Sequence, residues 1–185
     1  DLHDGIQKHE NLINVTDVST AEFVCYNGDI VTDKNDGDAA IKFFLQTPLD
    51  TYAWEKPFFM LRGNHETRGA FARNLHEFFP TQNNQFYYTF TYGDVFFVNL
   101  DCGEDKPDDS SEYGGLVDFD SYRSEQVEWL KKVVQLPAYK NARYRVFFCH
   151  IPPAGGGEQN VEVDIIKPDG TRQAVTDFSR AWHGD

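Results

Sequence analysis

Residues 59–69 read FMLRGNHETRG, an apolar stretch that turns abruptly polar. The apolar part predicts the end of a buried strand, and Asn64, His65 and Glu66 follow directly after Gly63. An amide, an imidazole and a carboxylate in one short loop can bind a metal ion or move a proton. The alternative is an ordinary surface turn, because Gly and Asn are common turn residues. The choice depends on whether similar side chains end other buried strands.

Other segments of the chain do place ligand-type side chains at comparable positions. They are Asp29, which follows Gly28 after the apolar run 21–27, His150 at the end of the run 143–150, and Asp1 and His3 at the start of the chain. Each is weak evidence alone, because a polar residue after a strand is usually part of a turn. Together, carboxylate, amide and imidazole suit Mn, Fe or Zn better than Mg or Ca alone. The set contains no thiolate, which argues against a structural zinc site.

The elements that must position these residues alternate along the chain. We expect helices over 6–16, 38–49, 68–79 and 124–136, buried strands over 21–27, 56–62 and 143–150, and hairpins over 86–101 and 161–175, which turn at Gly93-Asp94 and at KPDG. Pro48 should close the second helix, and Val127, Leu130 and Val134 should form the buried face of the last one. No linker or repeat divides residues 1–185, so we predict a single α/β domain with mostly parallel or mixed sheets. Ligands in such folds gather outside the carboxyl ends of the strands.

The order of these motifs resembles the calcineurin-like metallophosphoesterases. The likeness rests on D-x-H at 1–3, GD at 28–29, GNHE at 63–66 and the strand that ends in His150. The hairpin 86–101 and the helix EQVEWLKKVV look like the purple-acid-phosphatase-like branch. The resemblance implies a sandwich of two mixed β-sheets flanked by helices, in the order α/β/β/α and here incomplete. It also implies metal-dependent hydrolysis of phosphate esters.

The resemblance further implies a dinuclear site with two divalent metal ions, which would be Mn, Fe or Zn. The ligands would be Asp1, His3 and Asp29 for one ion, and Asp29, Asn64 and His150 for the other. Asp29 would then bridge the two ions, which together clamp the attacking and leaving oxygens of the reaction. His65 would stabilise charge or protonate the leaving oxygen, and Glu66 would orient His65.

Two departures from the family pattern affect these expectations. The family motif G-H-x-H is missing, and the nearest candidate, His183, follows a polar stretch and not an apolar strand. The strand expected before Asp1 is also missing, so we expect a chain clipped at both ends that binds metal weakly on its own. Val31 and Thr32 stand where a purple enzyme has its ferric-iron tyrosine. A purple chromophore is therefore not expected.

The net charge of −13 argues against a nucleic-acid binder that works through a broad basic surface. The acidic residues concentrate in 104–120, which we interpret as a solvated loop. Such a loop should repel substrates that carry many phosphates, and it favours small phosphomonoesters. The alternatives are a catalytically inert fragment of such a domain, and a phosphodiesterase or nuclease.

Several other residues could also contribute to this site. Arg62, Arg68 and Arg73 flank the GNHE loop, and each could either contact a phosphate or be structural. We assign Arg68 to the substrate site together with Asn64 and His65. We also expect His9 and His76 to be exposed, and Cys25 and Cys149 to lie in the core. We expect no disulfide framework among these two cysteines and Cys102.

The compartment stays undecided from the sequence. The chain has no apolar run long enough for a membrane span. It also opens without a basic stretch followed by an apolar one, so no signal peptide is recognised.

Overall fold

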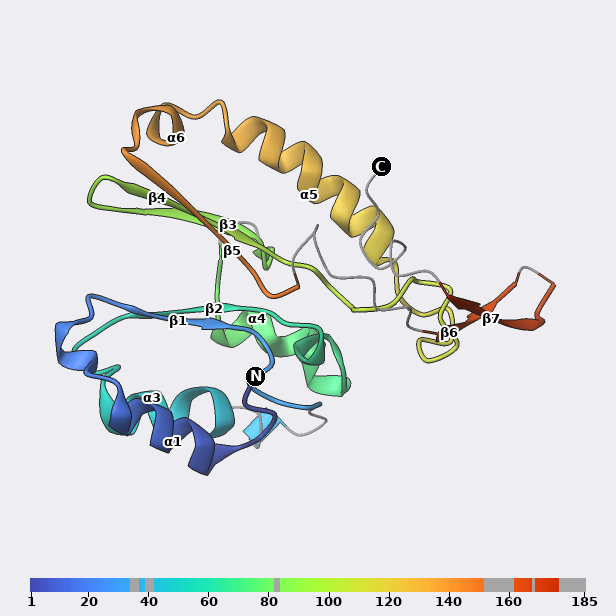
Figure 1. Cartoon of the computed structure of the whole chain (residues 1–185), viewed down its shortest axis with the longest axis horizontal. Coiled ribbons are helices and arrows are strands. Elements are labelled where there is room, and N and C mark those ends of the chain that lie inside the picture. The colour runs from blue at the N-terminus through green and yellow to red at the C-terminus, as the bar shows by residue number, and fades with distance from the viewer. Residues whose placement is uncertain (34–36, 39–41, 82–83, 152–161, 168, 177–185) are drawn as a thin grey trace.

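The computed structural model describes residues 1–33, 37–38, 42–81, 84–151, 162–167 and 169–176. Helices and sheets stack in the order helix, sheet, sheet, helix, as Figure 1 shows. The first helical layer contains α1 (Ile6–Val15) and α3 (Thr47–Thr51), and the sheet next to it contains β1 (Val24–Asn27) and β2 (Phe58–Leu61). The second sheet contains β3 (Tyr88–Tyr92), β4 (Val95–Leu100) and β5 (Tyr144–Cys149). The last layer contains the helices α5 (Phe119–Val133) and α6 (Pro137–Asn141). This arrangement confirms the predicted α/β/β/α sandwich.

The strand registers bring the candidate loops to one edge of the sandwich. β1 and β2 are parallel, with Asn27 opposite Leu61, so the loops that follow both strands start side by side. β4 and β5 are also parallel, with Leu100 opposite Cys149. β3 and β4 form the predicted antiparallel hairpin around Gly93-Asp94. The carboxyl ends of β1, β2 and β5 therefore carry the polar residues that the sequence singled out, and the end of β4 lies beside that of β5.

A ladder of aromatic rings joins the two sheets. The Phe59 ring stacks on Phe90 at 4.1 Å, Phe90 on Phe97 at 4.6 Å, and Phe97 on Phe148 at 6.1 Å. Phe23 meets Phe59, Phe90 and Phe97 edge-on. Aromatic pairs in these geometries stabilise a core beyond the area that they bury. The ladder therefore fixes the spacing of the sheets, and with it the spacing of the loops at their ends.

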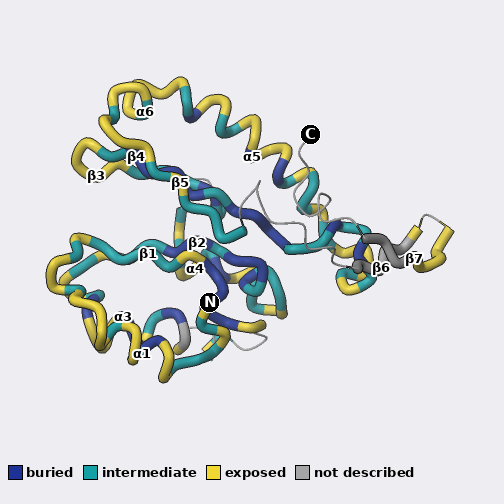
Figure 2. Tube along the Cα trace, viewed as in Figure 1, coloured by how far each residue is buried: buried dark blue, intermediate teal, exposed yellow. Residues whose placement is uncertain are grey.

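Each sheet also packs against helices on its outer face. Side chains of β4 alternate, so that Phe96 and Val98 pack against Trp129, Leu130 and Val133 of α5. Beneath the other sheet, a second cluster consists of Ile30, Val31, Phe44, Met60 and Leu75. Figure 2 shows β4 mostly buried and the outer side of α5 exposed. Each of the two sheets therefore packs apolar side chains on both of its faces, against the helices on one side and against the other sheet on the other side.

Two predicted helices differ from the observed ones. Over 38–49, the described part is a π-helical turn (Lys42–Gln46) that leads into α3, and Pro48 lies in the first turn of α3 instead of closing the helix. Proline fits there because the first helical N–H groups need no partner. Over 68–79, a 3₁₀ turn (Ala70–Asn74) precedes the short α4 (Leu75–Phe78). Gly69, with φ of 80°, delays the start of this helix.

The predicted buried face of α5 was also wrong in one position. Val127 is 48% exposed, whereas Arg123, Gln126 and Val133 are buried. Gln126 is buried because its side chain pairs with the backbone of Asp101, donating to the carbonyl at 2.8 Å and accepting from the N–H at 2.9 Å. A polar residue thus occupies the core face and rotates Val127 outward.

His9 is a further correction, because it is buried and not exposed. Its Nε2 lies 2.7 Å from the Tyr26 hydroxyl, which in turn contacts the hydroxyl of Tyr52 at 2.5 Å. His9 therefore does not face solvent. Its hydrogen-bonded contacts join α1, β1 and Tyr52, the residue that directly follows α3.

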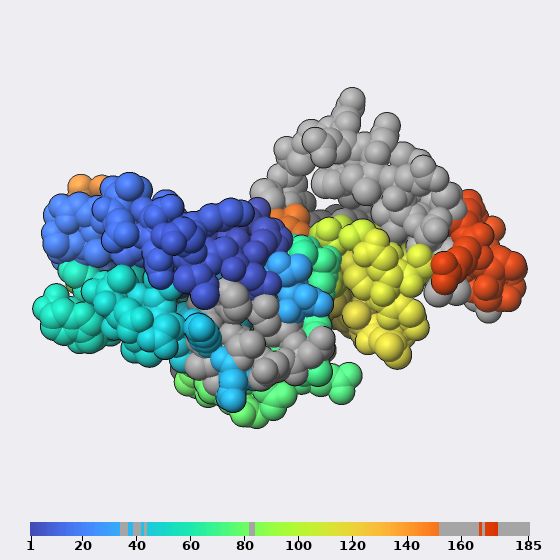
Figure 3. Space-filling view, turned by 90° about the horizontal axis from the view of Figure 1, so that it is seen from below, coloured from blue at the N-terminus to red at the C-terminus, as the bar shows by residue number. Residues whose placement is uncertain are grey.

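The second predicted hairpin is present as β6 (Glu162–Ile166) and β7 (Arg172–Thr176). Its turn closes with hydrogen bonds between Lys167 and Thr171, and between Gly170 and Lys167. Figures 1 and 3 both place this hairpin beside the acidic segment. Among the described residues, no helix combines the length and apolar character that a membrane span requires.

Candidate metal centre

The loops after β1 and β2 touch each other at two glycines. A Cβ on Gly28 would lie 2.7 Å from Gly63 Cα and 2.6 Å from His150 Nδ1. A Cβ on Gly63 would lie 2.6 Å from the Asp29 backbone nitrogen. Gly28 has φ of 79° and Asp29 has φ of 53°, in the left-handed region that side chains rarely adopt. The two loops can approach this closely only because both contact positions lack a side chain.

Glu66 holds the two loops together. Its carboxylate accepts four backbone N–H groups, from Asp29 at 2.8 Å, Ile30 at 2.7 Å, Val31 at 3.1 Å and Gly63 at 2.8 Å. Burial raises the pKa of Glu66, and the four donors oppose that rise. The expectation that Glu66 orients His65 is corrected, since its two oxygens are occupied by backbone donors. The contact that orients His65 is instead the Thr32 carbonyl, 2.7 Å from His65 Nδ1.

The Asp29 carboxylate is the centre of the candidate site. Its Oδ1 accepts the backbone N–H of His65 at 3.1 Å and lies 3.3 Å from His150 Nε2. Its Oδ2 lies 3.6 Å from His3 Nε2. Burial would raise the pKa of Asp29, but the hydrogen bonds and charges of His150 and His65 hold it below its usual value. The carboxylate is therefore ionised at neutral pH and faces imidazoles on both oxygens.

Two groups of side chains share this carboxylate. One group joins His3, Asp29 and His65, and the other joins Asp1, Asp29 and His150, with ligand atoms within 4.8 Å of one another in each. The expected partition paired Asp1 with His3, whereas the structure pairs Asp1 with His150. His3 instead meets His65, with ring centroids 4.5 Å apart. Asn64, the remaining candidate ligand, is buried beside them.

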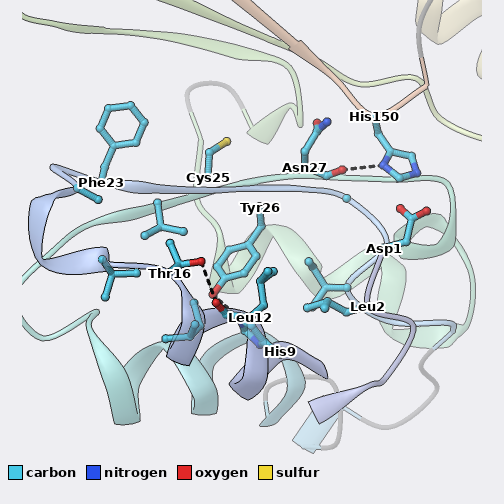
Figure 4. Close-up of a pocket in the computed structure, with 16 residues that line it drawn as sticks. Asp1, Leu2, His9, Leu12, Thr16, Phe23, Cys25, Tyr26, Asn27 and His150 are labelled. Carbon is cyan, nitrogen blue, oxygen red and sulfur yellow. Dashed lines mark hydrogen bonds between the residues drawn. The ribbon is translucent and has the colours of Figure 1, made fainter. Parts of the chain in front are cut away.

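His150 is held at the site from the opposite sheet. Its Nδ1 lies 2.6 Å from the Asn27 carbonyl, a contact drawn in Figure 4. Burial would lower the pKa of His150, but Asp29 and the Asn27 carbonyl raise it. A ring that donates through Nδ1 presents Nε2 toward Asp29, which is the arrangement of an imidazole that binds a metal ion. The donor set of the two groups, carboxylates and imidazoles, fits a divalent transition metal.

A cavity of about 690 Å³ lies between α1 and β1 and ends at Asp1 and His150. Figure 4 shows its other walls, which include the apolar side chains of Leu12 and Phe23. The polar ligand groups therefore lie at one end of the cavity and not within it.

The acidic segment contributes buried residues that the sequence interpretation missed. Glu104 is 3% exposed and Ser110 is 1% exposed, so the segment 104–120 is not simply a solvated loop. Glu104 forms a bidentate ion pair with Arg68, whose pKa rises chiefly through this contact. One sequence signal could have found it, because Glu104 closely follows β4, another strand that ends at the same edge.

Arg62, for which the sequence allowed either a phosphate contact or a structural role, has contacts of a structural kind. It donates twice to Asp101 Oδ2, at 2.6 and 3.0 Å, and its guanidinium lies 4.3 Å from the Phe86 ring centroid. The Tyr122 hydroxyl donates to the same carboxylate oxygen at 2.7 Å. This buried pair joins the end of β2 to the end of β4, and it commits the guanidinium of Arg62 to Asp101. Cys25, Cys102 and Cys149 are free thiols. Cys102 is buried, whereas Cys25 and Cys149, which we expected in the core, are half-buried.

The comparison with known families agrees with this geometry. A family model described as calcineurin-like phosphoesterase matches residues 1–173, and the chain belongs to that family. Membership implies metal-dependent hydrolysis of phosphoesters. Searches among curated proteins and among solved structures gave no significant match.

Proposed function

We propose that this protein is a phosphatase that hydrolyses small phosphomonoesters at a centre of two divalent metal ions. The observation that carries the proposal is the position of Asp29, whose carboxylate belongs to two ligand groups at once. Asp29 would hold both ions, with Asp1 and His150 on one side. His3 and Asn64 would complete the other side. When bound, the ions would activate water and polarise the phosphoryl group.

His65 is the residue that we assign to the substrate. Its backbone N–H is fixed by Asp29 and its Nδ1 by the Thr32 carbonyl. When Nδ1 donates to Thr32, Nε2 is the atom that can meet a phosphate oxygen, and the protonated ring would donate a proton to the leaving oxygen. Arg68 lies beside this ring and would bind the phosphate charge.

Two features support a small, singly phosphorylated substrate. The acidic segment reaches the site, because Glu104 and Asp105 both pair with Arg68. Carboxylates at this position disfavour a substrate with several phosphates. The net charge of −13 likewise disfavours a nucleic acid.

The test compares para-nitrophenyl phosphate with its bis ester, in buffer that contains Mn²⁺ and in buffer that contains a chelator. We expect faster cleavage of the monoester, and loss of cleavage of both esters in chelator. Faster cleavage of the bis ester would contradict the monoester assignment. Equal rates with and without metal would contradict the metal centre itself.

A further inference from the structure

Two of the three guanidinium nitrogens of Arg68 are committed to carboxylates. Nε donates to Glu104 Oε1 at 2.9 Å, and Nη2 donates to Glu104 Oε2 at 2.8 Å. Nη2 also donates to Asp105 Oδ1 at 3.2 Å. This is the planar, two-pronged pairing that only arginine makes with a carboxylate, and it fixes the plane of the guanidinium.

The third nitrogen, Nη1, is directed toward the candidate metal centre. It lies 3.2 Å from His65 Nε2 and 3.4 Å from His65 Nδ1. Within the described part of the chain, the contacts of Nη1 are with this ring and not with a carboxylate. An anion that approached His65 would therefore meet an N–H group that no acid neutralises directly.

Glu104 is itself held in place from several sides. The Thr67 hydroxyl donates to its Oε1 at 2.8 Å, and the Tyr113 hydroxyl donates to its Oε2 at 3.2 Å. Its backbone carbonyl accepts from Arg123 at 3.0 Å. With a side chain that is 3% exposed, Glu104 cannot turn to solvent without breaking these contacts.

We propose that Glu104 is a positioning residue for phosphate binding, which locks Arg68 so that Nη1 meets a phosphate oxygen beside His65. The inference rests on the proposed function and adds a residue to it. A guanidinium that is fixed in advance loses less conformational freedom when the ligand binds. The acidic segment then strengthens the binding of one phosphoryl group, although its net charge opposes larger anions.

The experiment measures the affinity of inorganic phosphate by calorimetry on the Mn²⁺-loaded protein, together with kcat and KM for para-nitrophenyl phosphate. The variants are Glu104→Gln, Arg68→Gln and the double variant. Glu112→Gln is the matched control, because it removes the same charge from the same segment but contacts Lys106 and not Arg68. Metal content is measured for each protein.

We expect Glu104→Gln to weaken phosphate binding and to raise KM by about tenfold, with kcat and metal content little changed. Arg68→Gln should weaken binding by about 10- to 100-fold, as loss of a charged hydrogen-bond donor does. The double variant should match Arg68→Gln within about twofold, because Glu104 acts only through Arg68. Glu112→Gln should change affinity by less than about twofold.

Additive effects of the two substitutions would overturn the proposal, and so would unchanged affinity in Glu104→Gln. A fall in metal content with unchanged phosphate affinity would make Glu104 structural. If Glu104→Gln does not fold, Tyr113→Phe removes one donor to the same carboxylate and should weaken binding by about two- to fivefold. A wild-type protein that binds phosphate but does not hydrolyse the ester would contradict the proposed function alone, since calorimetry still tests Glu104.

Discussion

The loops after β1 and β2 and the acidic segment 104–120 both bring carboxylates close to His65, but they are fixed differently. In the first region, one buried carboxylate, Glu66, accepts four backbone N–H groups at distances of 2.7 to 3.1 Å. In the second region, the carboxylates of Glu104 and Asp105 pair with the side chains of Arg68 and Lys106. Backbone donors are fixed by the fold itself, whereas the side-chain donors of Arg68 and Lys106 are fixed by the ion pairs that they form.

The difference suggests a division of roles. The backbone-bonded region places metal ligands, which require fixed positions before the ions bind. The ion-paired region carries groups that would face the substrate, and its buried carboxylate, Glu104, holds Arg68 in position for binding. His65 lies between the two, because it contacts Thr32 of the first region and also Arg68, the residue that pairs with the acidic segment.

The largest expected effect comes from the residue that both regions hold. His65→Ala should lower kcat for para-nitrophenyl phosphate by roughly 10²- to 10⁴-fold, as loss of a positioned acid does. Metal content, measured by elemental analysis, should stay at the wild-type value. Loss of metal along with activity would make His65 a ligand in the group with His3 and Asp29, and would contradict the substrate role.

Among the predicted changes in stability, the largest should follow removal of the Glu66 carboxylate from the first region. Glu66→Ala leaves four N–H groups without their acceptor in a buried site, so we expect a loss on the order of 3–5 kcal/mol in the free energy of unfolding. Urea denaturation measures this loss. The exposed Glu77, with a single side-chain contact to Asn74, provides the control, and Glu77→Ala should cost less than about 0.5 kcal/mol. Similar losses for both variants would show that Glu66 does not tie the loops.

The free energy of unfolding should change far less when an ion-pair partner in the second region is removed. Lys106 pairs with Asp105 at 3.1 Å and with Glu112 at 3.3 Å, and both acids are solvent-accessible. Lys106→Ala should therefore reduce stability by about 0.2–1 kcal/mol, and high salt should shrink the difference from wild type. A loss that matches Glu66→Ala, or that salt does not change, would erase the contrast between the regions.

The smallest effect concerns His9, a buried residue whose ring contacts the Tyr26 hydroxyl and whose pKa the charge of Glu10 raises less than burial lowers it. Burial lowers its pKa below 6.5, so the folded protein binds this proton less readily than the unfolded chain. Its contribution is complete above about pH 6.5, the unfolded pKa, and declines as pH falls through the interval down to the folded pKa. His9→Gln should remove this part of the acid sensitivity in denaturation curves at pH 7.5 and 5.5. An unchanged pH dependence in His9→Gln would show that His9 titrates alike in both states.

The strands and both hairpins could be predicted from the sequence because their signals are local. Apolar runs such as 56–62 and turn residues such as Gly93-Asp94 determine strand and turn without reference to the rest of the chain. The break after Gly69 and the outward rotation of Val127 were missed. The position of Val127 depends on a tertiary contact, since Gln126 occupies the core face only because Asp101 supplies its partners. The break after Gly69 depends on its φ of 80°, which the periodicity of the sequence does not specify.

The site shows the same limit. The order of the motifs pointed to Asp1, His3, Asn64 and His150, and the structure brings the imidazoles and carboxylates among them to Asp29. The bond partners of Glu66 could not be predicted, because GNHE specifies a spacing and not which oxygen meets which N–H. The burial of Glu104 was not predicted, because it lies in a run of acidic residues and the composition of such a run predicts exposure to solvent. Its burial follows from Arg68, which is 36 residues away in sequence.

The central claim is that the Asp29 carboxylate serves two metal ions. Asp29→Asn keeps the size of the side chain and removes its charge, and metal binding to wild type and variant can be titrated by calorimetry with Mn²⁺. The control is Asp50→Asn, an exposed acid whose contact is with Gln46 and not with the candidate centre. Because the G-H-x-H motif is missing from the sequence, we predict two weak sites in the wild type and in Asp50→Asn, and neither site in Asp29→Asn. Two sites in Asp29→Asn with unchanged affinity would contradict the bridging role and the account built on it.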